Sequence, residues 1–291
     1  MTESEGTRPG VLLYDDGGEP EADLQGVASY IERVSGIAAR VAGDITARLS
    51  QNQGPAGATG SPNARDGAVE QVGSIRDVAR AFAATRVHNL MRRESFEEPL
   101  PAEVDFLARQ LSRSGPRRFG YLYDAMAVMS IYRALLPSGD DPSIVFTYQL
   151  MATWDEGDLK YHARVMVAGS PSIISIPGVV LAPARPREYY MYQAGARAAG
   201  MSDEEIDLKM KETIGDRYVT HGDPRIAEIL KGYALQAAAY WILGEAFCED
   251  PDCRLFNAHW QEEMLRAQLG GKYEFCPRHE KILSGNRAQG G

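Results

Sequence analysis

The chain has 291 residues, of which 44% are hydrophobic and 24% are charged, as is typical of a folded soluble protein with a substantial core. Its 31 Lys and Arg stand against 40 Asp and Glu, which leaves a formal net charge of −9. This acidic balance argues against a broad nucleic-acid-binding surface, because a negative surface repels phosphates.

The first residues, Met1–Glu5, have neither the basic nor the apolar region of a signal peptide. The most apolar helical stretch, 232–248, is too short and too polar to span a bilayer. Three cysteines cannot form a closed set of disulfides, which argues against a secreted disulfide scaffold. We therefore expect a cytoplasmic protein without a membrane partner.

The first elements are predicted to be a strand, a helix and a second strand. Residues 11–14 are an apolar run before a turn, residues 22–34 carry apolar side chains at helical spacing, and residues 37–45 return as a strand. This order favours a βαβ unit with a parallel strand pair. Residues 51–66 are rich in Gly, Pro, Asn and Ser, and we interpret them as a flexible insertion.

Three helices are predicted next, at 75–91, 102–112 and 121–136. The middle of the chain then changes from helical spacing to strand-like composition. Residues 143–154 and 162–167 are rich in β-branched and aromatic side chains and are joined by turn-forming residues, which predicts a hairpin. Residues 172–181 predict another strand, although Pro177-Gly178 divides it. The result is a mixed parallel and antiparallel sheet.

The last third is predicted to be helical. Ser202 and Glu205 form a capping box that opens a helix. Asp223-Pro224 is interpreted as an N-cap followed by a first-turn proline, and that helix is expected to end at Gly244. The predicted fold is therefore α/β, with a mixed sheet, flanking helices and a helical C-terminal lobe, in a single domain over residues 1–291.

All three cysteines lie near the C-terminus, in the pattern Cys248-x4-Cys253 followed by Cys276-x2-His279. Zinc prefers four tetrahedral sulfur or nitrogen ligands, often as two close pairs separated by a longer loop. Buried cysteines with an unrelated histidine are the alternative, but both segments are polar and turn-like. The pattern predicts one zinc ion that stabilises a helical lobe through residues 244–282. Because four protein ligands leave no position for water, this zinc is expected to be structural.

His259 is the competing fourth ligand. It could also form a separate metal site with Glu262 and Glu263, which follow it at helical spacing. The simpler interpretation is a helix capped by Asn257, with the two glutamates in its first turn.

The run from Gly244 to Cys253, followed by Glu274-Phe-Cys-Pro277, resembles the C-terminal part of the archaemetzincins, which are zinc metallopeptidases. That family carries H-E-x-x-H-x-x-G-x-x-H, then C-x4-C and later C-x2-C. The chain is also similar to an uncharacterised archaeal family classed with the metallopeptidases. The resemblance is close over 232–279 and extends loosely, as element order, over most of the chain. It implies a zincin-like fold in an archaeal protein.

In this resemblance, Gly244 matches the glycine of the motif, and the three cysteines match the family's structural zinc ligands. His279 stands where the family has its last cysteine, and Leu255 lies near its Met-turn methionine. The positions of the three zinc-binding histidines and of the catalytic glutamate hold side chains that neither bind zinc nor accept a proton: Ala237, Trp241, Phe247 and Ala238. We expect Trp241 and Phe247 to fill the vacated space as core residues.

Two weaker candidates lie elsewhere. The segment 185–190 is a solvated face or the wall of a ligand groove, and exposed Arg and Tyr favour the solvated face. His162 and His221 lie near Asp158 and Asp223 in the sequence, which is weak support for a general base.

The first functional hypothesis is a degenerate metallopeptidase, or pseudopeptidase, that binds a peptide or protein and holds one structural zinc. It assigns no catalytic residue and no cofactor besides zinc. The alternative is an active metal-dependent hydrolase whose catalytic ligands have moved to His259, Glu262 and Glu263, with His162 or His221 contributing. A zinc-knuckle nucleic-acid binder is disfavoured by the acidic balance. The sequence indicates no oligomeric state.

Overall fold

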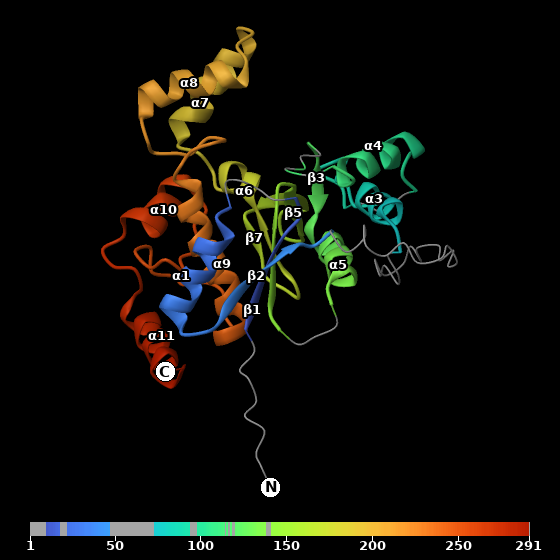
Figure 1. The fold of residues 1–291 in the computed structure, drawn as a ribbon. Coiled ribbons are helices and arrows are strands. Elements are labelled where there is room, and N and C mark those ends of the chain that lie inside the picture. The colour runs from blue at the N-terminus through green and yellow to red at the C-terminus, as the bar shows by residue number, and fades with distance from the viewer. Residues whose placement is uncertain are drawn as a thin grey trace.

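A computed structural model describes the following parts of the chain: residues 10–17, 22–46, 73–93, 98–113, 115, 117, 120–137 and 141–290. The insertion predicted at 51–66 lies outside the described residues. Figure 1 shows a central sheet with helices on both sides and a helical pair that projects from the body.

The described strands form two sheets. The larger has the order β2-β1-β4-β8-β7, in which neighbours are parallel except for β7 and β8. Its strands are β1 (Val11–Asp15), β2 (Ala39–Asp44), β4 (Ser143–Thr147), β7 (Met166–Val167) and β8 (Ser172–Ser175). The smaller has the order β3-β5-β6, with β3 parallel and β6 antiparallel to β5. Its strands are β3 (Leu122–Asp124), β5 (Leu150–Asp155) and β6 (Lys160–Arg164).

Helices connect and cover these strands. In chain order they are α1 (Leu24–Ser35), α3 (Ile75–Ala84), α4 (Pro101–Leu111), α5 (Ala125–Leu135), α6 (Ile176–Leu181), α7 (Arg187–Ala198), α8 (Asp203–Ile214), α9 (Ile226–Leu243), α10 (Gln261–Leu265), the π-helix η1 (Arg266–Gly270) and α11 (Pro277–Gly290). The α7 and α8 helices form the projecting pair in Figure 1. The sequence-based prediction missed α7.

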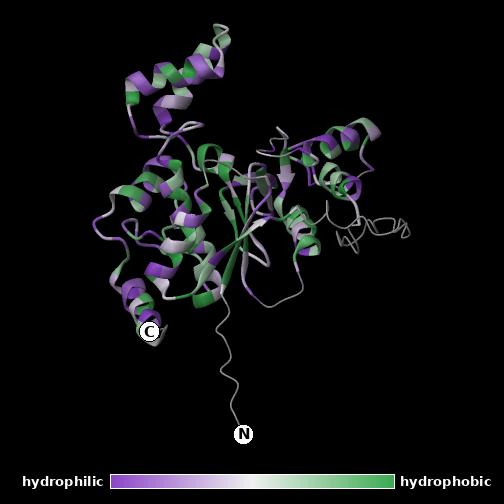
Figure 2. Cartoon of the chain, viewed as in Figure 1, coloured by the Kyte–Doolittle hydropathy of each residue, from purple (hydrophilic) through white to green (hydrophobic). Residues whose placement is uncertain are grey.

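The larger sheet is covered on both faces, because its strand residues alternate between two apolar clusters. On one face, Leu13 and Phe146 pack with α1 and α9. On the other, Tyr14 and Val145 pack with α3, α4 and α5. Figure 2 accordingly shows the central strands as mainly hydrophobic and the α7–α8 pair as mainly hydrophilic. In the part of the chain that is described, no helix is long and apolar enough to cross a membrane.

The α/β class, the βαβ unit with parallel β1 and β2, and the mixed sheet are confirmed. The strand predicted at 143–154 is wrong in one respect, because it is two strands in different sheets. Between them, the backbone N–H of Gln149 donates to the Thr147 hydroxyl at 3.0 Å and turns the chain away. The strand predicted at 172–181 ends at Ser175, whose hydroxyl accepts the N–H of Gly178 and caps α6.

Several predicted helix boundaries are also wrong. The helix predicted at 75–91 ends at Ala84, and residues 122–124 form a strand before α5. Helix α9 begins at Ile226, so Asp223 is not its N-cap. Helix α10 begins after Trp260, whose backbone N–H donates to Glu263, so Asn257 is not an N-cap either. The capping box of Ser202 and the end of α9 at Gly244 are confirmed.

A buried carboxyl lies where the parallel strands end. Asp16 follows β1 and is 4% exposed, and its Oδ2 accepts hydrogen bonds from the hydroxyls of Tyr132 at 2.7 Å and Thr147 at 2.5 Å. Arg117 donates to the Asp16 carbonyl and pairs with Asp44. Burial raises the pKa of Asp16 to about 6, although the hydrogen bonds from Thr147 and Tyr132 oppose this rise. The network therefore joins β1, β4 and α5 around a carboxyl group that releases its proton at a higher pH than an exposed aspartate does.

Asp16 should make stability depend on pH. Since its pKa is higher in the folded chain than in the unfolded chain, the folded state retains a proton that the unfolded state has released between about pH 4 and 6. The contribution of this group is full below about pH 4 and is lost as the pH rises through about 6, a change of about 2–3 kcal/mol. In denaturant unfolding, the free energy of unfolding of wild type should fall relative to that of Asp16→Asn as the pH rises from about 4 through about 6.

Wild type and Asp16→Asn share all other titrating groups, including the cysteines, so the difference between their free energies of unfolding isolates the effect of Asp16. Asp203→Asn is the matched control, since the Asp203 side chain is 62% exposed. A stability difference between wild type and Asp16→Asn that stayed constant from about pH 4 to about pH 7 would contradict the prediction.

Candidate metal centre

Two loops bring the cysteines and a histidine together after α9. Gly244 ends α9 at φ +72°, a left-handed conformation that glycine adopts without strain. The backbone N–H of Cys248 then donates to the Leu255 carbonyl at 2.8 Å, and the N–H of Cys253 donates to the Asp250 carbonyl at 3.0 Å. These bonds fold residues 248–255 into a turn with both cysteines at one place.

The second pair lies at the start of α11. Cys276 precedes Pro277, the first residue of the helix, and the N–H of Glu280 donates to the Cys276 carbonyl at 2.9 Å. A spacing of three residues places two side chains on the same face of a helical turn. Cys276 and His279 therefore point in the same direction for a local reason.

The four side chains converge. Their ligand atoms all lie within 4.8 Å of one another. The sulfurs of Cys248 and Cys276 are 3.9 Å apart, and Nδ1 of His279 lies 3.2 Å from the Cys276 sulfur and 3.6 Å from the Cys253 sulfur. A tetrahedral zinc site requires about 3.8 Å between sulfurs and about 3.6 Å between sulfur and nitrogen. These three distances are close to the required values, so the cluster is compatible with a tetrahedral zinc ion.

Three of the four side chains are also shielded from water, and Cys248 is half-buried. Cys253 and His279 are both 0% exposed, and Cys276 is 6% exposed. Burial raises the pKa of the Cys253 thiol to about 12 and raises that of Cys248 as well. Thiolates at this place would therefore need a cation beside them, and zinc is the dication that suits three sulfurs and one imidazole.

Helix α9 and the residues after it hold the positions that match the peptidase motif of the resembled family, and their burial differs from the expectation. Ala237 and Ala238 are 0% exposed and lie in the apolar cluster between α9 and the sheet. Trp241 and Phe247, however, are 38% and 42% exposed. The expectation that they fill a vacated core is wrong, because the small alanines already pack against the sheet and the C-terminal end of α9 faces solvent.

The other histidines lie outside the four-residue cluster. His259 is exposed, and its backbone N–H donates to Glu263, while Glu262 pairs with Arg217. His162 lies 2.9 Å from Asp158 in the β5–β6 hairpin. A shared metal ion requires at least three Cys, His, Asp or Glu side chains close together. In the described residues, this condition is met by Cys248, Cys253, Cys276 and His279.

A cleft of about 720 Å³ lies between α6 and the α7–α8 pair. Arg185 and Tyr189 line it but are 9% and 2% exposed, so the prediction of a solvated face is wrong for them. The Arg185 guanidinium pairs with Asp207 at 2.6 Å and lies 4.2 Å from the centre of the Tyr189 ring. His221 also lines the cleft. The segment 185–190 therefore buries Arg185 and Tyr189 on one wall of the cleft, while Arg187, Glu188 and Tyr190 are exposed.

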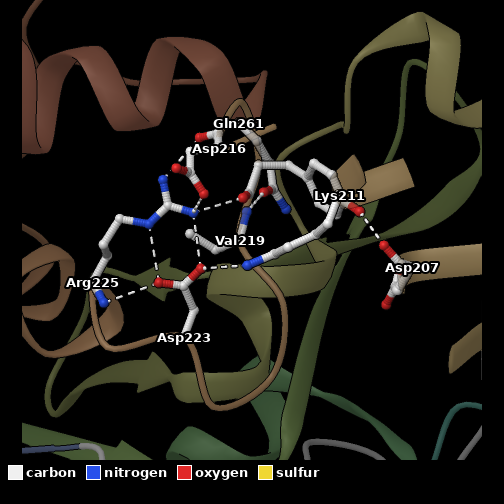
Figure 3. A network of polar contacts seen from close by, with 8 residues as sticks. Asp207, Lys211, Asp216, Val219, Asp223, Arg225 and Gln261 are labelled. Carbon is white, nitrogen blue, oxygen red and sulfur yellow. Dashed lines mark hydrogen bonds and ion pairs between the residues drawn. The ribbon is translucent and has the colours of Figure 1, made fainter. Parts of the chain in front are cut away.

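Figure 3 shows the polar network beside this cleft. Asp223 accepts hydrogen bonds from Arg225 at 2.8 Å and from Lys211 at 3.3 Å. Burial alone would raise the pKa of Asp223, but these hydrogen bonds outweigh it and lower the pKa to about 2. The backbone N–H of Val219 donates to Gln261 at 2.7 Å. The ionised Asp223 thus anchors α8 to the start of α9.

Two residues near the metal centre escaped the sequence-based prediction. Arg254, between Cys253 and Leu255, is 7% exposed and reaches from the turn to Glu228 in α9. Glu245 follows Gly244 and lies beside His279. Arg254 lies next to a predicted ligand, which was an available signal, but the contact partners of both residues are far away in the sequence.

Comparisons with known proteins bear on this site. The model of a family described as "Probable metallopeptidase family (DUF6775)" matches residues 61–286, a span that contains all four predicted ligands. Among solved structures, the chain is similar to the crystal structure of an archaemetzincin from Methanopyrus kandleri, with 13% identity, a TM-score of 0.41 and 98% of each chain covered. No protein with a curated description matches the chain.

Proposed function

We propose that this chain, which belongs to the probable metallopeptidase family, is a zinc-stabilised member that binds a peptide or protein without hydrolysing it. The observation that carries the proposal is the convergence of four ligand atoms within 4.8 Å, three of them on buried side chains and one on the half-buried Cys248. Cys248, Cys253, Cys276 and His279 would hold the ion. When bound, zinc would supply a cross-link between the turn after α9 and the start of α11.

The absence of hydrolysis is proposed from the chemistry of α9. A zinc peptidase needs metal ligands that leave one position for water, and a group that removes a proton from it. Ala237 and Ala238 offer neither function, and both are buried against the sheet. The four-ligand cluster leaves no position for water. Both observations support a non-hydrolytic role.

The ligand-binding part of the proposal rests on the cleft between α6 and the α7–α8 pair. Leu181, Tyr190 and Leu208 line it and are 48%, 46% and 68% exposed. Exposed apolar side chains beside charged groups such as Lys211 suit a peptide, which presents both apolar side chains and a polar backbone.

Elemental analysis of the purified protein, together with a peptide-hydrolysis assay, tests the proposal. We expect one zinc per chain and no cleavage that a chelator abolishes. His259→Ala is the matched variant, because His259 is exposed and lies outside the cluster. It should leave the zinc content unchanged.

A second, exchangeable metal that disappears in His259→Ala would instead support the relocated hydrolase, particularly if chelator-sensitive peptide cleavage disappeared with it. Protein without bound zinc would overturn the proposed metal centre itself.

A further inference from the structure

The side of His279 that faces away from the cysteines is buried without a hydrogen bond. Nδ1 lies 3.2 Å from the Cys276 sulfur, whereas Nε2 is buried and has no hydrogen-bond partner in the described part of the chain. An imidazole that binds a metal through Nδ1 carries its proton on Nε2. A buried N–H without an acceptor is costly, so this geometry calls for a partner.

Glu245 is the carboxylate placed to accept that proton. Its Oε1 lies 3.6 Å from Nε2 of His279, slightly beyond hydrogen-bond distance. The left-handed turn at Gly244 ends α9 and directs the next residue toward the start of α11. The same Oε1 also accepts a hydrogen bond from the exposed Arg278.

We propose that Glu245 is the positioning residue of the metal centre: it accepts the Nε2–H of His279 and so aims Nδ1 at the three sulfurs. This inference rests on the proposed zinc site and adds a residue that supplies no ligand atom. Histidines that bind metals commonly donate their second N–H to a carboxylate, and loss of that carboxylate weakens metal binding. Glu245 would also couple the end of α9 to the ligand pair at the start of α11.

A simpler role for Glu245 is an ion pair with Arg278. The Arg278 side chain is 63% exposed and that of Glu245 is 36% exposed, and an exposed ion pair contributes little. Removing Arg278 eliminates the ion pair but leaves the carboxylate beside His279. The two roles are therefore separable by substitution.

Zinc dissociation constants, measured by competition with a chromophoric chelator, test the proposal. We expect Glu245→Ala to weaken zinc binding by about 10- to 100-fold. Glu245→Gln keeps an acceptor oxygen but not the charge, so it should weaken zinc binding less than Glu245→Ala does. Arg278→Ala, the matched control, should stay within about threefold of wild type.

Nitrogen-15 NMR of the zinc-bound wild type provides a readout that does not depend on any variant folding. The signals of His279 should show Nδ1 bound to the metal and Nε2 carrying a proton. In Glu245→Ala, that proton should exchange faster with water, because its acceptor is gone.

The outcomes separate this inference from the proposed function. Zinc binding by wild type with an unchanged dissociation constant in Glu245→Ala would overturn the role of Glu245 and leave the metal centre standing. An equal loss in Arg278→Ala, or His279 bound through Nε2, would also overturn it. Wild-type protein that binds no zinc would overturn the proposed metal centre, and this inference with it.

Discussion

Replacing Cys253 with serine is expected to release the zinc ion and unfold the C-terminal lobe. Cys253 is 0% exposed, and its sulfur faces Nδ1 of His279 at 3.6 Å. Structural zinc can contribute on the order of 10 kcal/mol to folding, comparable to the whole stability of a typical domain. Elemental analysis should therefore show Cys253→Ser with less than one zinc per chain, and thermal unfolding should show its transition lowered or lost.

Chelator treatment distinguishes metal loss from a simple packing defect at Cys253. If zinc stabilises the lobe, a strong chelator should lower the melting temperature of wild type toward that of Cys253→Ser and leave the variant nearly unchanged. A chelator that changed neither protein, or a variant that melted like untreated wild type, would contradict the structural role of the metal.

Arg254→Met is expected to destabilise the fold by about 2–3 kcal/mol, because it removes the hydrogen bonds of a buried guanidinium to two partly exposed carboxylates. The Arg254 side chain is 8% exposed and donates to Glu228 at 2.6 Å and to Glu274 at 3.4 Å. Its guanidinium also lies 4.5 Å from the centre of the Tyr30 ring in α1. Methionine keeps much of the apolar stem but leaves both carboxylates without this partner. Denaturant unfolding with saturating zinc measures the loss.

Arg33→Met is the matched control for Arg254→Met, because Arg33 approaches two of the same partners, Glu274 and Tyr30, from solvent. It lies 3.6 Å from Glu274 and 5.1 Å from the centre of the Tyr30 ring, but its side chain is 63% exposed. The expected loss is about 0–1 kcal/mol. Equal losses in the two variants would show that the burial of Arg254 is not what matters.

Much of the fold followed from local pattern. A short apolar run, apolar residues at helical spacing and the order of elements predicted the βαβ unit at the N-terminus, and a capping box predicted α8. The errors occurred where a side chain turned the chain. Thr147 separates β4 from β5, and Ser175 converts a strand into α6. Such caps compete with strand-like composition over a few residues, which periodicity alone does not resolve.

The metallopeptidase relationship expected from the residues after Gly244 is confirmed by the family model. For the positions of the peptidase motif, the sequence predicted the chemistry of the side chains but not their exposure. In the resemblance to the archaemetzincins, Ala238 stands at the position of the catalytic glutamate and Ala237 at that of one histidine, and neither side chain can bind zinc or accept a proton. The exposure of Trp241 and Phe247 depends on how α9 lies against the sheet, which the sequence does not reveal.

The sequence by itself determined which residues could bind a metal and how each pair is arranged. A spacing of five positions from Cys248 to Cys253 closes a turn, and a spacing of three from Cys276 to His279 makes one helical turn, so each pair meets for short-range reasons. Only the tertiary structure decided that the two pairs converge, that Glu245 faces the outer nitrogen of His279, and that Arg254 is buried beneath them. Those contacts join segments far apart in the chain, and they form only when α1, α9 and α11 pack together.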